Sequence, residues 1–233
     1  ATPVYIAAQQ GHVDAIKALA TLGASVNTPN NNGATPVYIA AQQGHVDAIK
    51  ALAALGASVN TPTNDGQTPV WIAAGKGHVD AIKALATLGA SVNTPTNDGQ
   101  TPVWIAAGKG HVDAIKALAA LGASVNTPSI DCATPVYIAA EYGHMDAIKA
   151  LAALGASVNT PNNDGTTPLY GAAKEGHADA IKALAALGAS VNTPNNDGAA
   201  PILVAASNGH VDAIKVLAAL GASVNTPSND CAT

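Results

Sequence analysis

A unit of 33 residues recurs along this chain without insertions, and its second copy, residues 34–66, reads ATPVYIAAQQGHVDAIKALAALGASVNTPTNDG. A short unit cannot bury its own apolar face, so units of this kind stack in order and each contacts mainly its neighbours. We therefore predict a single solenoid array over residues 1–233, with repeats at 1–33, 34–66, 67–99, 100–132, 133–165, 166–198 and 199–231 and the start of an eighth at 232–233.

The first half of each repeat predicts a short helix. In the second repeat Thr35 and Pro36 favour a helix start, because a Thr side chain can cap free backbone amides and Pro fits the first helical turn. The helix is predicted to run from Val37 to Gln43, and Gly44 ends it by adopting a left-handed conformation.

The second half predicts another helix and then a projecting turn. His45 opens this helix, which runs from Val46 to about Leu55 and presents Val46, Ile49 and Leu52 as a core face. The segment 60–66 is dense in turn-forming residues and predicts a turn or hairpin that projects as a finger. The pattern therefore predicts an all-α fold with β-turn or hairpin fingers.

The repeat resembles the ankyrin repeat over the whole chain. The matching residues of the second repeat are Thr35, Pro36, Ala40, Ala41, Gly44, His45, Gly56, Ala57, Val59 and Asn60. The resemblance implies an α-solenoid of antiparallel helix pairs in an L-shaped array, with a concave face formed by the first helices and the fingers. Three positions depart from the family pattern: Tyr38 replaces a His, Ala53 replaces the second Leu of a pair, and the finger acid is displaced to Asp65.

Composition argues against several classes of function. The net charge is −5, and the ten basic residues are all Lys, most of them within four residues of an Asp, which argues against a nucleic-acid partner. No apolar run approaches the roughly 18 residues of a membrane span. The only Glu residues are Glu141 and Glu175. Residues that repeat this regularly do not supply a nucleophile together with a base and a group that orients it. We therefore predict no enzyme activity, no cofactor and no small-molecule substrate.

Seven His residues occupy one position of the repeat and suggest a metal ladder. Helices pack about 8–10 Å apart, whereas each ligand of one zinc lies about 2 Å from the metal, so neighbouring members could not share an ion. We predict no metal and a structural role at the start of the second helix for His12, His45, His78, His111, His144, His177 and His210.

Two further sets of residues favour plain interpretations. An Asp stands three residues before a Lys in every second helix, as in Asp47 and Lys50, which predicts an exposed pair worth about a few tenths of a kcal/mol. Cys132 and Cys231 replace the finger-tip Gly three repeats apart, on the order of 30 Å, which excludes a bridge within one chain. We expect free thiols at exposed turns, with pairing or modification between chains as the alternative.

Differences between repeats cluster at the aromatic position and at the end of the first helix. By the resemblance these positions line the concave face, where Tyr and Trp would make rigid anchors for a protein partner. The alternative is that each ring packs on the neighbouring helix. The predicted partner-binding residues are Tyr5, Tyr38, Trp71, Lys76, Trp104, Lys109, Tyr137, Tyr142 and Tyr170.

A second predicted surface lies on the outer helices. Ala48, Ala51 and Leu55 recur in every repeat away from the core stripe, which predicts an exposed apolar ribbon, unless neighbouring repeats half-bury it. The self-assembly residues expected on it are Leu22, Leu55, Leu88, Leu121, Leu154, Leu187 and Leu220.

The terminal repeats carry no polar capping face. The first keeps Val4, Ile6, Val13 and Ile16, and the last keeps Ile202, Val204, Val211 and Val216. Together with the missing initiator Met, this suggests either a window on a longer array or chains that stack head to tail.

The predicted function is therefore a non-enzymatic structural or scaffolding repeat protein that assembles with copies of itself, end to end or side by side. The alternative is a discrete protein-binding module that uses its concave face, natural or consensus-designed. Residues of this kind do not indicate a compartment.

Overall fold

The computed structural model describes residues 1–225, which hold fourteen α-helices in pairs. The first helices of the pairs are α1 (Pro3–Gln9), α3 (Pro36–Gln43), α5 (Pro69–Gly75), α7 (Pro102–Gly108), α9 (Pro135–Glu141), α11 (Pro168–Lys174) and α13 (Pro201–Ser207). The second helices are α2 (Val13–Thr21), α4 (Val46–Ala54), α6 (Val79–Thr87), α8 (Val112–Ala120), α10 (Met145–Ala153), α12 (Ala178–Ala186) and α14 (Val211–Ala219). No β-strand occurs in this part of the chain, so the predicted all-α fold with projecting turns is confirmed.

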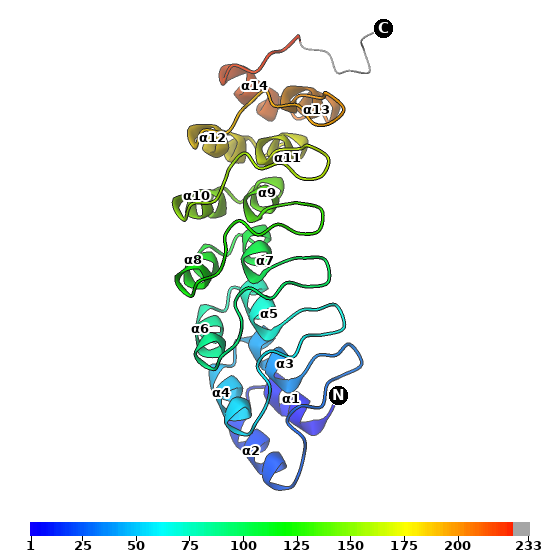
Figure 1. The fold of residues 1–233 in the computed structure, drawn as a ribbon, viewed down its shortest axis with the longest axis vertical. Coiled ribbons are helices and arrows are strands. Elements are labelled where there is room, and N and C mark those ends of the chain that lie inside the picture. The colour runs from blue at the N-terminus through cyan, green and yellow to red at the C-terminus, as the bar shows by residue number, and fades with distance from the viewer. Residues whose placement is uncertain (226–233) are drawn as a thin grey trace. The chain divides into compact units, whose positions relative to one another are not determined.

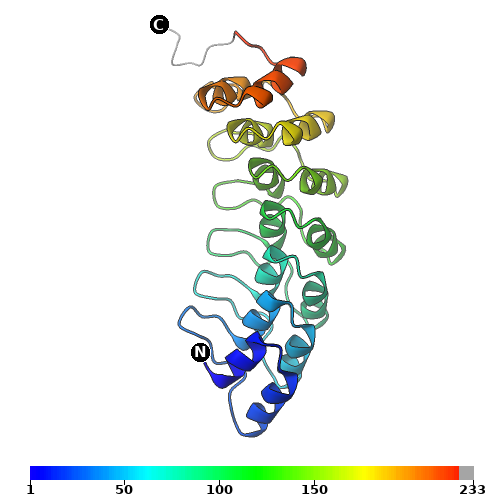
Figure 2. The same cartoon turned by 180° about the vertical axis from the view of Figure 1, so that it is seen from behind.

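The chain forms two compact units, Ala1–Ala106 with Asp113–Ser124 and Ala107–Val112 with Val125–Thr233. In the first unit α1, α3 and α5 pack in that order, and so do α2, α4 and α6. In the second unit the corresponding rows are α9, α11 and α13, and α10, α12 and α14. Figures 1 and 2 show that the fingers of each unit project on the side of the first helices. Cys231 and the predicted start of an eighth repeat lie outside the described residues, and the division of the whole chain into one array of seven repeats stays a prediction.

The first helices begin as their Thr-Pro sequence predicts. The Thr35 hydroxyl accepts a hydrogen bond from the backbone N–H of Tyr38 at 3.2 Å, and Pro36 occupies the first helical turn. Gly44 ends the helix in the left-handed region, with φ of 75°. The same Thr cap begins every first helix except α13, which begins after Ala200 and has no side-chain cap.

The His at the start of each second helix makes a contact that differs from the prediction. His45 does not cap its own helix; its Nε2 lies 3.1 Å from the carbonyl oxygen of Gln9 in the preceding repeat and donates to it. The ring lies on Gly11, where an added Cβ would come within 2.9 Å of it. His78, His144 and His210 bond to the preceding repeat in the same way. The residue is structural, as predicted, but it joins two repeats instead of orienting one helix.

The apolar core corrects the predicted face of the second helix. Ile49 and Leu52 are fully buried as expected, but Val46 is only half-buried. Ala48 and Ala51, predicted on an exposed ribbon, are buried, Ala48 to 1% exposure. Small Ala side chains let the second helices of neighbouring repeats approach closely, so Ala48 packs on the preceding repeat instead of facing solvent.

An Asn in each linker joins neighbouring repeats by two hydrogen bonds. The Asn60 side chain accepts from the backbone N–H of Ser91 at 2.9 Å and donates to the carbonyl oxygen of Gly89 at 3.1 Å. The equivalent residues Asn27, Asn93, Asn126, Asn159 and Asn192 donate to the matching Gly of the next repeat. We call each such set of two bonds an Asn bridge. Each Asn bridge thus fixes, through one side chain, the distance between the segments that follow the second helices of two neighbouring repeats.

The fingers are also joined to one another. In the first unit the backbone N–H of Asn64 donates to the carbonyl oxygen of Asn32 at 3.0 Å, and its side chain donates to that of Asn31 at 3.1 Å. The second unit repeats this contact between Asn196 and the preceding finger. Because buried and half-buried backbone groups need partners, stacking of the fingers satisfies amides that an isolated finger would leave to water.

We predict that Asn60→Ala lowers the free energy of unfolding by about 1–2 kcal/mol, because two hydrogen bonds between repeats are lost. The measurement is urea denaturation followed by circular dichroism. The matched control is Asn225→Ala, since Asn225 occupies the same repeat position but has no hydrogen-bond partner among residues 1–225. Equal effects of the two substitutions would show that the bridge does not contribute to stability.

Candidate functional site

The aromatic row on the first helices lies between repeats. Tyr5, Tyr38, Trp71, Tyr137 and Tyr170 are buried, and Trp104 is half-buried. In the second unit the Tyr137 ring faces Gly171 of the next repeat, where an added Cβ would lie 3.5 Å from it. The Tyr137 ring therefore packs on the neighbouring helix, which is the alternative that the sequence left open.

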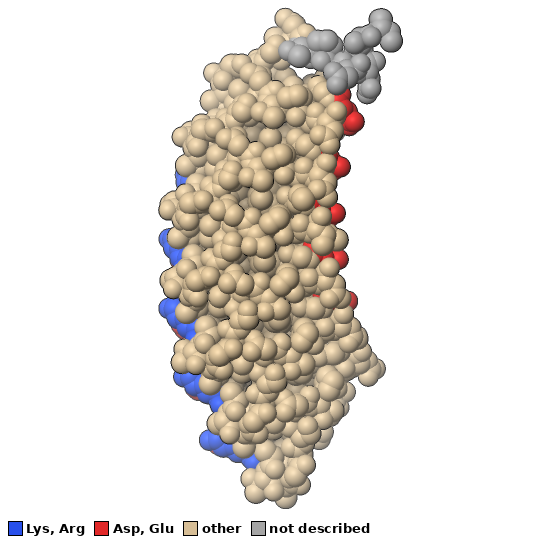
Figure 3. Space-filling view, viewed as in Figure 1, with Lys and Arg blue, Asp and Glu red and all other residues tan. Residues whose placement is uncertain are grey.

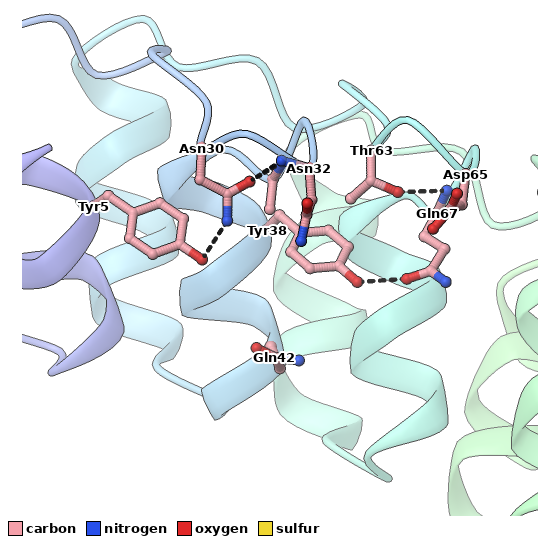
Figure 4. Close-up of a pocket in the computed structure, with 9 residues that line it drawn as sticks. Tyr5, Asn30, Asn32, Tyr38, Gln42, Thr63, Asp65 and Gln67 are labelled. Atoms are coloured by element: carbon pink, nitrogen blue, oxygen red, sulfur yellow. Dashed lines mark hydrogen bonds between the residues drawn. The ribbon is translucent and has the colours of Figure 1, made fainter. Parts of the chain in front are cut away.

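A groove of about 240 Å³ in the first unit shows how those polar edges are arranged (Figure 4). The Tyr38 hydroxyl donates to Oε1 of Gln67 at 2.7 Å, and the Asn30 side chain donates to the Tyr5 hydroxyl at 3.2 Å. Asp65 lines the same groove from the finger. The site offers hydroxyl, amide and carboxylate groups between two fingers, which suits a polar or cationic segment of a protein.

The second unit has a groove of the same kind, with a volume of about 390 Å³. Tyr137 and Thr166 share a hydrogen bond of 3.2 Å at its wall, and Tyr170 lies beside them. Two carboxylates, Asp164 and Asp197, face it from neighbouring fingers. Two separate units thus build the same site from the same repeat positions.

The finger tips carry a row of exposed carboxylates. The row consists of Asp65 and Asp98 in the first unit and Asp131, Asp164 and Asp197 in the second. Figure 3 shows these carboxylates along the finger edge of the units, opposite the edge that carries the lysines of the second helices. The finger side of each unit is therefore negatively charged, and an exposed row of one sign attracts cationic partners at a distance.

The other predicted partner-binding residues are accessible. Lys76 and Lys109 are exposed at the ends of α5 and α7, and Tyr142 follows α9 with 58% of its surface exposed. Nε1 of Trp71 is buried without a hydrogen-bond partner, which costs stability and which no sequence pattern indicated. The part of these residues in partner binding stays a prediction.

The predicted outer row of leucines is exposed. Each member directly follows a second helix and keeps at least 38% of its surface accessible. The members are Leu22, Leu55, Leu88, Leu121, Leu154, Leu187 and Leu220. Between the leucines Ala51, Ala117 and Ala183 are buried, whereas Ala84 and Ala150 are half-buried, so the apolar surface between leucines is only partly accessible.

The ion pairs of the second helices and the described cysteine lie at the surface. The predicted i,i+3 ion pair forms between Lys182 and Asp179 at 2.9 Å and between Lys215 and Asp212 at 3.4 Å, all with solvent-exposed side chains. It does not form between Asp47 and Lys50 among the described residues. No three His, Cys, Asp or Glu side chains in residues 1–225 gather into a group that could hold a metal ion. Cys132 is free and exposed, as predicted, and no helix of the described residues is long and apolar enough to cross a membrane.

The Asn bridges are functional contacts that the sequence interpretation missed. Each bridging Asn stands directly after a Val in every repeat, so the signal was the repetition of Asn60 and its equivalents. That pattern was used only to recognise the repeat. The groups that these Asn side chains contact are backbone atoms of another repeat. A sequence does not show which backbone atoms a side chain will reach.

Burial, with smaller contributions from the nearby Tyr5 and Asp65, raises the pKa of Tyr38 to about 12. A raised pKa means that the unfolded chain, whose Tyr ionises near pH 10, loses its proton first. Stability from this group is complete below pH 10 and is lost as the pH rises through 12.

We therefore predict that the free energy of unfolding falls between pH 10 and 12, and that Tyr38→Phe makes this fall smaller. Difference absorbance spectra of tyrosinate between the two proteins would report one hydroxyl that ionises near pH 12. Ionisation of that hydroxyl near pH 10 would contradict the buried environment.

Comparison with known proteins agrees with the stacked helix pairs. A family model described as ankyrin repeats (3 copies) matches residues 1–63, 55–129 and 136–228. The chain is similar to the crystal structure of the human ASB11 ankyrin repeat domain, with a TM-score of 0.84 and 29% identity over 97% of this chain and 100% of that chain. No curated protein sequence gives a significant match. The fold generally serves protein–protein interaction and is typically non-enzymatic. The helix pairs, the matched segments and the likeness in structure agree, and the chain belongs to the ankyrin-repeat family.

Proposed function

We propose that this chain is a non-enzymatic scaffold that associates with copies of itself, with one end face of the array packing on the other end face of the next copy. The observation that carries the proposal is that the contacts between repeats are made of two different halves. The Asn of one repeat needs the Gly and Ser of the next, and the Gly of one repeat receives the His of the next. Among residues 1–225 the first repeat carries one of these halves without its partner, and the seventh repeat carries the other.

The face of the first repeat carries one half. Ile6 is 47% exposed, whereas Ile39 at the same position of the second repeat is 4% exposed. Ala15 is exposed, whereas its equivalent Ala48 is buried against the preceding repeat. The surface that packs on a preceding repeat is thus apolar and accessible here.

The face of the last described repeat carries the other half. Gly209 has open space where the equivalent Gly11 meets a His ring, and Asn225 has no partner within residues 1–225. On the first repeat His12 and the backbone of Ser25 occupy the positions that would fill them. Such a contact joins two different surfaces, so it adds copies head to tail and builds a filament unless the copies close into a ring.

We predict that the weight-average mass of the chain rises with concentration in sedimentation velocity and that Ala15→Glu holds it at the mass of one chain. A carboxylate on the end face would have to be buried unpaired against the next copy, which is costly. The matched control is Asn32→Asp, which adds the same charge at a finger position where other repeats carry Asp. A wild-type chain of constant mass, or Ala15→Glu that associates like the wild type, would overturn the proposal.

A second candidate is a module that binds a basic segment of another protein on its finger side. It is supported by the two grooves, in which Asp65, Asp164 and Asp197 stand beside tyrosine and amide groups; Lys174 also lines the second groove, whose charged side chains sum to −1. Each exposed ion pair contributes at most about 1 kcal/mol, so such a partner would need several of them. Repetition of one acidic finger tip after another supplies them within each unit.

For this candidate we predict that a fluorescent decalysine peptide binds the chain at low salt and that joint Asp164→Asn and Asp197→Asn substitution weakens binding by about tenfold. Fluorescence anisotropy gives the dissociation constants. Asp179→Asn is the control, since Asp179 lies on a second helix away from the fingers. Unchanged affinity of the double variant would rule out the finger side as the site.

A further inference from the structure

The finger tip at residues 129–132 differs from the others. It reads Ser-Ile-Asp-Cys where the second repeat has Thr-Asn-Asp-Gly. Ile130 is 62% exposed, and five other fingers carry a polar Asn at its position: Asn31, Asn64, Asn97, Asn163 and Asn196. An isolated apolar side chain at the end of a projecting turn has no use in packing within its own repeat.

The backbone of this tip is held in place. Asn163 of the next finger donates from its backbone N–H to the carbonyl oxygen of Asp131 at 3.1 Å and from its side chain to that of Ile130 at 3.3 Å. Within the turn the N–H of Cys132 donates to the carbonyl oxygen of Ser129 at 3.0 Å. Ile130 and Asp131 are therefore presented by a fixed turn, which lowers the entropy lost on binding.

A groove on the outer surface of the first unit is lined by apolar and basic side chains that complement those of the finger tip. It lies between α4 and α6 and has a volume of about 700 Å³. Val46, Ala84 and Leu88 supply its apolar wall, and Leu88 is one of the exposed outer leucines. The groove is wide enough for a branched aliphatic side chain and its turn.

The charges around this groove favour binding of an acidic segment. Lys50, Lys83 and Asp80 line it, which gives a net charge of +1. Lys182 in the second unit is paired with its helix neighbour at 2.9 Å, but neither Lys50 nor Lys83 makes an ion pair among the described residues. Two unpaired ammonium groups beside an apolar wall complement a tip that carries one carboxylate and one aliphatic side chain.

We propose that the finger tip of residues 129–132 in one copy docks in the groove between α4 and α6 of a second copy. Ile130 packs on Leu88 and Val46, and Asp131 lies between Lys50 and Lys83. The inference rests on the proposed self-association, but it uses a lateral contact that is separate from the end faces. A single contact of this size is weak, and it gains strength where several copies are already aligned.

Cys132 at the same tip provides a direct test. In a chain with Cys231→Gly, Thr87→Cys places a second thiol on the wall of the groove, and a short bismaleimide then joins thiols that lie close together. We expect cross-linked dimers between positions 132 and 87 of different chains, identified by mass spectrometry of peptides. The matched control is Gln43→Cys, an exposed position on a first helix, which should give no dimers above those of the parent chain.

Ile130→Asn restores the residue of the other fingers, so folding is preserved, and it should lower the yield of the 132–87 cross-link about tenfold through the lost aliphatic contact. Ala15→Glu removes end-to-end growth, so it should lower the yield of that cross-link without abolishing it, because the lateral contact lies outside the end faces. Absence of the 132–87 cross-link in a chain that associates, or an Ile130→Asn yield equal to that of the parent, would overturn the lateral contact alone. A chain that stays monomeric and uncross-linked would overturn both proposals.

Discussion

The two hydrogen bonds that each linker Asn makes to the next repeat are the interaction on which the rest of the structure depends. One amide supplies a donor and an acceptor, so Asn60 fixes both the distance and the direction of its neighbour. Once the linkers are spaced in this way, the Ala faces of the second helices meet, the His rings lie on glycines, and the fingers come within hydrogen-bonding distance. Nothing in a lone repeat satisfies these groups, which is why the family builds arrays.

The same spacing explains why the finger side is suited to binding. Tyr hydroxyls at the mouths of the grooves are held by hydrogen bonds, that of Tyr38 to Gln67 of the next repeat and that of Tyr5 to Asn30 of its own repeat. The aromatic rings themselves are used for packing. A partner would therefore meet preformed polar edges and carboxylates, with little rearrangement of buried side chains.

Features set by residues within one helix were predicted from the sequence. Contacts between neighbouring repeats were not. Thr35, Pro36 and Gly44 act within one helix, so its start and end were predicted correctly. The spacing of Val46, Ile49 and Leu52 describes one helix alone and could not show that Ala48 meets another helix, so its exposure was predicted wrongly. The bond of His45 to the Gln9 carbonyl and that of the Tyr38 hydroxyl to Gln67 join residues 36 and 29 positions apart in different repeats, and a pattern read within one repeat does not display them.

At Ala200 the Thr hydroxyl that caps the other first helices is missing, and this affects how readily the helix pair that follows it unfolds. Every other first helix of the described chain begins with a Thr that caps a backbone amide, and α13 begins without one. Stability in a one-dimensional array is close to a sum of local and nearest-neighbour contributions, so repeats need not open together. The helix pair α13 and α14 then lacks the roughly 0.5–2 kcal/mol that a Thr cap contributes, so it opens more readily than it would with Thr at position 200.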